Sequence, residues 1–293
     1  MQALTADDAF LSQRIDGRVE QVFSRAVNLF IPEQQRLLTL LSESSDNAPN
    51  SCRLALTHCN HLFRPGEQVR FTESGIAVGD DKWIETSSCQ RWLMPTWSLT
   101  AERFNVIPWL GWAETLHQQL GRDDTLFLYA GDNPFYREMA KELQLRRQIL
   151  NTALTRKQNV AVAVAVAHFI GLGIGLTPSS DDYLVGFSII LFIKGHPLEK
   201  YRETFLAALR RIGNNTTLLS KVTMEAAFHQ RYRESIARLV ANIITEPNCF
   251  LTQSITDIKN IGSSSGCDML YGMADACALS HQSGGNYVNQ DSC

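Results

Sequence analysis

Hydrophobic and polar positions alternate over short stretches in the first part of the chain, up to about residue 125. Such stretches cover residues 18–23, 36–41, 52–57, 67–71, 75–78 and 82–86, and turn-forming clusters such as S-S-D-N-A-P-N, R-P-G and V-G-D-D separate them. Alternation of this kind, broken by Gly, Pro, Asn and Asp, is typical of strands joined by turns. The pattern predicts a mostly antiparallel sheet or small barrel, with one helix near residues 109–120.

The pattern changes from about residue 133, where apolar residues recur at helical spacing. We expect helices over residues 134–155, 159–169, 181–193, 197–212, 216–244 and 267–279, several of them bounded by Gly or Pro. The sequence therefore predicts an α+β protein with a β-rich domain over residues 1–130 and a helical domain over residues 131–280. The polar residues 281–293 are expected to form a flexible tail.

Composition and charge narrow the class of protein. The net charge of -3, without a basic block, argues against nucleic acid as a partner. Residues 159–176 are nearly uncharged, but the His and glycines within them and the aspartates that follow favour a buried helix over a membrane span. The cysteines form no C-x-x-C pair and no signal-peptide pattern precedes them, so we expect free thiols in the cytosol. They are Cys52, Cys59, Cys89, Cys249, Cys267, Cys277 and Cys293.

The most unusual stretch is G-L-G-I-G-L-T-P-S-S-D-D-Y-L-V-G, residues 171–186, which leads into a predicted helix. Glycines let the backbone turn tightly and let a ligand approach the peptide planes. A helix N-terminus adds unpaired N–H groups and partial positive charge, and Ser180 or Asp181 is well placed to cap it. We expect a pocket for a phosphate or carboxylate group. Its lining would be Gly173, Gly175, Thr177, Ser179 and Ser180.

Asp181 and Asp182 add carboxylates to a site that otherwise favours anions. Adjacent residues of a helix point about 100° apart, so one aspartate can cap while the other faces a ligand. A carboxylate repels an anion unless a cation or a substrate N–H group lies between them. The ligand would be an amide or ureido acid with both anionic oxygens and N–H donors, or a Mg²⁺ ion would be bound. The competing interpretation is a tight turn at a helix start without a ligand.

Part of this stretch recurs near the C-terminus. S-S-D-D-Y-L-V-G (179–186) aligns with S-G-C-D-M-L-Y-G (265–272), with Ser, Asp, Leu and Gly at four matching positions. A Gly/Ser-rich turn precedes each copy. The second loop therefore contributes Ser264, Ser265 and Gly266 as candidate binding residues and Asp268 as a third candidate catalytic carboxylate.

Two further segments contain candidate polar residues. G-N-N-T-T-L-L-S (213–220) leads into a helix, with Asn215 or Thr216 as the expected cap, and Thr217 and Ser220 either stabilise the helix start or line the pocket. T-H-C-N-H (57–61) holds two His and one Cys, a weaker metal candidate because no further ligand cluster accompanies it.

The two loops resemble the signatures of the AllH family. Residues 171–186 resemble its G-x-G-x-G-L-T-P-S-x-D-D-x-L-x-G stretch, and 262–272 its G-x-x-S-G-x-D-x-L-x-G stretch. N-T-T-L-L-S-K-V-T-M-E-A-A (215–227) resembles the family's T-x-x-S-x-x-x-L-x-x-A segment, and S-R-A-V-N-L (24–29) a less specific one. The chain departs from the usual family residues at Ser180, Met224 and Cys267, none of which removes a carboxylate or a loop glycine.

The resemblance implies a subunit of oxamate carbamoyltransferase, an enzyme of allantoin catabolism and thus of purine degradation. That enzyme converts oxalurate and phosphate to oxamate and carbamoyl phosphate. Its complex contains an acyl-CoA-synthetase-like subunit, which would be the partner here, with neither nucleic acid nor membrane involved. Two alternatives stay open: a non-catalytic assembly subunit, and a stand-alone metal-dependent hydrolase that uses Asp181, Asp182 and Asp268.

Overall fold

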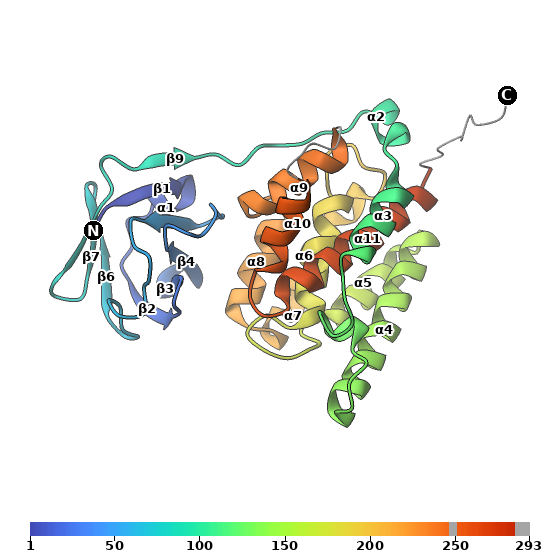
Figure 1. Ribbon diagram of the computed structural model, residues 1–293, viewed down its shortest axis with the longest axis horizontal. Helices are drawn as coiled ribbons and strands as arrows, with labels where there is room; N and C mark the ends of the chain where they lie inside the picture. Colours follow the sequence, from blue (N-terminus) through green and yellow to red (C-terminus); the bar gives the residue numbers. More distant parts are fainter. Residues whose placement is uncertain (246–250, 285–293) are drawn as a thin grey trace. The chain divides into compact units, whose positions relative to one another are not determined.

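The computed structural model describes residues 1–245 and 251–284, and the chain divides into two compact units (Figure 1). The first unit comprises residues 1–95 together with 232–234, and the second contains the remaining described residues. The predicted α+β class, with a sheet first and helices after it, is confirmed. Five cysteines of the described part are free thiols, whereas Cys249 and Cys293 lie outside the described residues, as does most of the expected tail.

The first unit is built on a mixed nine-stranded sheet that curls into a half-barrel (Figure 1). The strands occur in the order β8-β7-β6-β2-β3-β4-β5-β1-β9. Most neighbours are antiparallel, as the sequence predicts, but β4 with β5 and β1 with β9 are parallel. The bounds are β1 Ala3–Asp7, β2 Gly17–Val22, β3 Ala26–Ile31, β4 Arg36–Leu41, β5 Ser51–Leu54, β6 Gln68–Phe71, β7 Gly75–Val78, β8 Lys82–Glu85 and β9 Gln90–Trp92, and a short helix α1 spans Asp8–Leu11.

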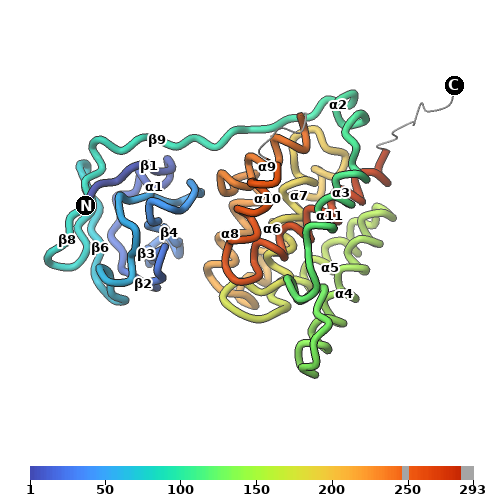
Figure 2. The backbone as a smooth tube through the Cα atoms, viewed as in Figure 1, coloured from blue at the N-terminus to red at the C-terminus, as the bar shows by residue number. Residues whose placement is uncertain are grey.

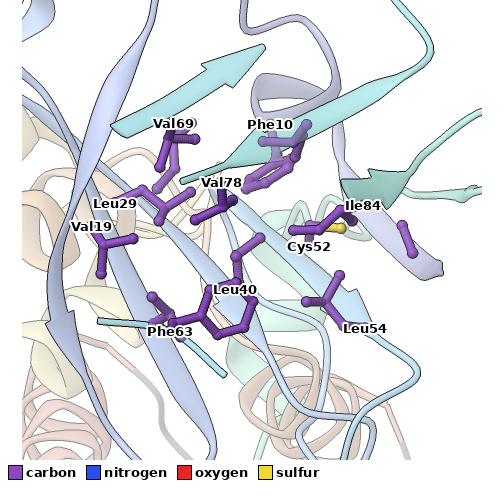
Figure 3. Close-up of a cluster of buried hydrophobic side chains, with 14 of the residues drawn as sticks. Phe10, Val19, Leu29, Leu40, Cys52, Leu54, Phe63, Val69, Val78 and Ile84 are labelled. Carbon is purple, nitrogen blue, oxygen red and sulfur yellow. The ribbon is translucent and has the colours of Figure 1, made fainter. Parts of the chain in front are cut away.

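The core of this unit gathers on one face of the sheet (Figure 3). Phe10 from α1 packs there with residues such as Val19, Leu29, Leu40 and Val78. In β6 the burial alternates strictly between exposed and buried residues, which is the pattern that revealed the strand. These residues supply the apolar burial that stabilises the unit.

The second unit is helical. Its helices are α2 Ala101–Val106, α3 Trp109–Gln118, α4 Pro134–Thr155, α5 Asn159–Phe169, α6 Ser179–Leu191, α7 Arg202–Ile212, α8 Leu218–Phe228, α9 Glu234–Ile244 (its first residue belongs to the first unit), α10 Leu251–Lys259 and α11 Ser265–Gln282. The bounds of α4 and α5 agree with the sequence prediction. α5 is 11 residues long, and none of the helices in the described residues is long and apolar enough to cross a membrane.

The long helix expected over residues 216–244 is wrong, because the chain forms two helices there. α8 ends where Gln230 takes a left-handed backbone conformation, with a φ of 59°. The following residues belong to the first unit, where Arg233 forms an ion pair with Asp46 and Glu234 accepts a hydrogen bond from the Asn47 side chain at 2.7 Å. These fixed contacts prevent one continuous helix.

Helices α6 and α11 lie among the other helices of the second unit (Figure 2), and every residue of α6 is buried. Two glycines let their backbones approach. A Cβ atom on Gly186 would stand 1.9 Å from the carbonyl oxygen of Met269, and one on Gly272 would stand 2.1 Å from that of Tyr183. Only glycine permits such contacts, so the repeated glycine of the sequence marks this helix pair.

Candidate functional site

Asp181 holds the loop in front of its own helix in place. It is fully buried, and its Oδ1 accepts a hydrogen bond from the backbone N–H of Gly171 at 2.7 Å. Its Oδ2 accepts from the Thr216 and Ser220 hydroxyls, the latter at 2.6 Å. Ser180 likewise accepts from the N–H of Leu172 at 2.9 Å. The expectation that one of these residues caps α6 is therefore wrong, because both bind backward to residues 171–172.

Asp182 has the opposite character. It is 2 % exposed, and its Oδ2 has no hydrogen-bond partner in the described structure. Burial is the main cause that raises the pKa of Asp182 to about 8; the Thr177 and Ser265 hydroxyls beside it oppose the rise, and the negative charges of Asp268 and Asp181 add to it. A buried polar oxygen without a partner is costly, which makes the Asp182 carboxyl group a candidate for binding a ligand.

Asp268 repeats this arrangement on α11. It is fully buried, its Oδ1 accepts a hydrogen bond from the Thr125 hydroxyl, and its Oδ2 has no partner in the described structure. Burial raises the pKa of Asp268 to about 7, against the opposing effect of the hydroxyls of Thr125, Ser179 and Ser264. Each of these two aspartates is therefore held on a glycine-packed helix, with one carboxyl oxygen left over.

The two loops meet directly. The hydroxyls of Thr177 and Ser265 are hydrogen-bonded at 2.8 Å, which joins the first loop to the start of α11. Gly173 has a φ of +134°, and a Cβ there would stand 2.4 Å from the backbone nitrogen of Ser179, so the loop folds tightly onto α6. Gly175 has a φ of +93° and open space around it, which leaves this part of the loop accessible.

The remaining candidates support the site from outside. Thr217, not Asn215 or Thr216, caps α8 by accepting from Ser220 N–H at 3.1 Å, and its hydroxyl donates to the carbonyl of Leu176 at 2.5 Å. Gly266 packs against α10, because a Cβ there would stand 1.7 Å from the carbonyl oxygen of Ile258. The structure thus gathers the predicted loop residues at the starts of α6, α8 and α11.

Sequence reasoning missed Thr125 and assigned Thr216 only a cap. Thr125 lies just before a short 3-10 turn, Leu126–Leu128, far in sequence from the loops that it joins. No motif or periodicity distinguishes it from other threonines in loops. Its contact with Asp268 depends on the tertiary packing alone.

Metal ligands do not gather here. Among residues 1–245 and 251–284 there is no group of three or more His, Cys, Asp or Glu side chains placed to hold a metal ion. In the weaker candidate segment, His58 faces the Ser24 hydroxyl at 3.1 Å and Cys59 is buried.

Two grooves, of about 630 and 500 Å³, flank Val160 on α5 and do not include the aspartates.

The starts of two helices thus bring together two buried carboxyl groups, several hydroxyls and the peptide groups of glycine loops. Residues 169–277 match the oxamate carbamoyltransferase subunit AllH, and residues 2–91 match the AllH family N-terminal domain. The chain belongs to the AllH family, since these matches cover most of it. No solved structure matches the chain.

Proposed function

We propose that this protein is the AllH-type subunit of an oxamate carbamoyltransferase that binds a ureido acid and phosphate at the loops 171–186 and 262–272. The observation that carries the proposal is the pair of unpartnered buried carboxyl oxygens, on Asp182 and Asp268, at the starts of two helices. Family membership supplies the reaction class. In that reaction, oxalurate and phosphate give oxamate and carbamoyl phosphate.

The site residues suit a ligand with two kinds of group. Helix starts and Gly/Ser loops provide N–H and O–H donors for phosphate and carboxylate oxygens. The leftover oxygens of Asp182 and Asp268 provide hydrogen-bonding partners for the ureido group. Asp181 has all its oxygens engaged within the chain, so its proposed contribution is to hold residues 171–172 in position.

The ligand reaches these oxygens when the loops part. The connection to break is the hydroxyl contact between Thr177 and Ser265, since it joins the loops beside Asp182. Gly173 and Gly175 give that loop backbone freedom, and Leu176, which is 44% exposed, offers an apolar contact to a partner. We place the protein in a cytosolic complex with an acyl-CoA-synthetase-like subunit.

The test is the formation of carbamoyl phosphate from oxalurate and phosphate by the purified chain, alone and with its partner subunits. We expect turnover in the complex. The double variant Asp182→Ala/Asp268→Ala should assemble normally and lose at least about 100-fold in kcat, the usual effect of removing an acid–base group. Unchanged turnover would make the chain a non-catalytic assembly subunit. Breakdown of oxalurate by the chain alone, without carbamoyl phosphate formation and abolished by a chelator, would favour the metal-dependent hydrolase.

A further inference from the structure

The two aspartates lie on helices whose contacts are reciprocal, as an internal two-fold pseudosymmetry requires. In the alignment of 179–186 with 265–272, Tyr183 corresponds to Met269 and Gly186 to Gly272. In the structure Gly186 approaches Met269, and Gly272 approaches Tyr183. The two contacts are equivalent, because exchanging each residue for its aligned counterpart turns one contact into the other. A two-fold relation between the helices requires this reciprocity.

The serines obey the same relation. The Ser265 hydroxyl lies beside Asp182, and the Ser179 hydroxyl lies beside Asp268, so each aspartate is served by the first residue of the other helix. Asp182 lies beside Ser265, and Gly186, four residues further along α6, lies beside Met269, four residues further along α11. The helices are therefore parallel, and their positive N-terminal ends converge on the carboxyl pair.

Resting on the function proposed above, we propose that Asp182 and Asp268 form one proton-sharing carboxyl pair that grips a carbamoyl or amide group by its C=O and N–H edges. The protonated member donates its O–H to the carbonyl oxygen, and the ionised member accepts the N–H. Each has one unpartnered buried oxygen for this contact. A ligand with two carboxylates offers no N–H and cannot satisfy both members.

The charges around the pair agree with a single shared proton. Asp181 on α6 is the other carboxyl that acts on Asp182, and its own oxygens are occupied by Gly171, Thr216 and Ser220. The pKa of Asp182 is raised to about 8, mainly by burial and to a smaller extent by the charges of Asp268 and Asp181, and burial raises the pKa of Asp268 to about 7. Two charged carboxylates in one buried site repel each other, so the first proton is retained into neutral pH.

A shared proton also balances the transfer step. In phosphorolysis of an N-carbamoyl acid, a phosphate oxygen forms a bond to the carbamoyl carbon and the bond from that carbon to the amide nitrogen breaks. Hydrogen phosphate loses a proton, and the departing nitrogen gains one. During the step the ionised carboxyl takes up the phosphate proton, and the carboxyl whose O–H binds the carbonyl oxygen in the ground state releases its proton to the departing nitrogen. The pair therefore holds one proton before and after the step.

The first test needs no turnover. Infrared titration of the full chain should reveal a carboxyl group that remains protonated at neutral pH. In the Asp268→Asn variant the pKa of Asp182 should fall by about one unit or more, because the neighbouring charge is gone. Thr125→Val is the matched control: it removes the hydrogen bond to Asp268, retains both carboxyls and should raise the pKa of Asp268. If the pKa of Asp182 is the same in the Asp268→Asn variant as in the wild type, the proposal that the two carboxyls share a proton is refuted.

The second test uses calorimetry with two probes of similar size, oxamate and oxalate. The wild-type chain should bind oxamate about 10-fold or more tightly than oxalate, a difference of ~1.4 kcal/mol. Asp182→Asn/Asp268→Asn removes the repelling charge and should abolish or reverse this preference. If folded wild-type protein binds oxamate and oxalate equally tightly, the proposal that the carboxyl pair binds an amide group is refuted.

The two proposals fail separately. If the two carboxyls titrate as a coupled pair and the chain prefers oxamate, but no carbamoyl phosphate forms, the proposed carboxyl pair stands and the proposed carbamoyltransferase function is rejected. Carbamoyl phosphate formation by a complex whose Asp182 and Asp268 titrate independently would do the reverse.

Discussion

Asp182→Asn should make the protein more stable at neutral pH. An unfolded aspartate has a pKa of about 3.9, whereas burial raises the pKa of Asp182 to about 8 in the folded chain. At pH 7 folding must therefore protonate this group, at about 1.4 kcal/mol per unit between 3.9 and 7, or roughly 4 kcal/mol. Asparagine avoids this cost but buries an amide, so a net gain of about 2–4 kcal/mol is expected.

The pH dependence identifies the cause. Because the folded pKa is raised, the stability contribution of Asp182 is fully present below about pH 4 and is lost as pH rises through about 8. The difference in melting temperature between variant and wild type should be at or slightly below zero at about pH 4, where only the cost of burying the amide remains, and reach roughly 5–15 °C at about pH 7. Thermal denaturation of both proteins at matched pH values measures it.

Asp132→Asn provides the control, since it makes the same atomic change on a fully exposed side chain, whose ion pair with Arg137 contributes little in water. It should change stability by less than about 0.5 kcal/mol at every pH. Destabilisation by Asp182→Asn at neutral pH, or a gain that stays the same from acid to neutral pH, would refute the reasoning. Either result would mean that the folded chain already compensates the charge of Asp182.

Three other changes test the packing and the buried charges. Gly186→Ala should cost about 3 kcal/mol or more by forcing α6 and α11 apart, whereas Gly111→Ala on α3, with its nearest neighbour 3.9 Å away, should gain about 0.5–1 kcal/mol in urea unfolding. Arg147→Met strands the buried carboxylate of Asp275, so it should cost about 3 kcal/mol, most of which Arg147→Met/Asp275→Asn should restore. Burial lowers the pKa of His196 to about 3, so stability should fall below about pH 6.5, by roughly 2 kcal/mol at pH 5, and His196→Gln should remove this dependence.

The sequence predicted elements best where local patterns dominate. α4 and α5 have the predicted bounds because proline begins the first and helical spacing continues through both. β3 escaped detection, since it is a central strand with β2 and β4 on either side and its buried Asn28 breaks the apolar pattern while bonding to Gln21 and Thr39. The break between α8 and α9 was hidden because tertiary contacts of Arg233 and Glu234 cause it.

At the site, composition indicated the chemistry but not the division of roles. The sequence alone does not distinguish the adjacent Asp181 and Asp182. The fold shows that both carboxyl oxygens of Asp181 accept hydrogen bonds, whereas one oxygen of Asp182 has no partner in the described structure. Thr125 could not be found in advance, because a lone threonine carries no signal until a helix from elsewhere in the chain packs against it.

The stability cost of the carboxyl pair itself argues for a function. A helix pair that needed only to pack would gain from neutral residues at 182 and 268, because both positions are buried and each leaves an oxygen unpaired. Structural roles of acidic residues look different in the same chain: Asp275 is paired with Arg147 and accepts from the Tyr183 hydroxyl at 2.7 Å. Burial that hydrogen bonds compensate only in part, at two equivalent positions of the paired helices, is therefore the pattern expected of groups kept for a ligand. The stabilising effect of Asp182→Asn would be the physical counterpart of that role.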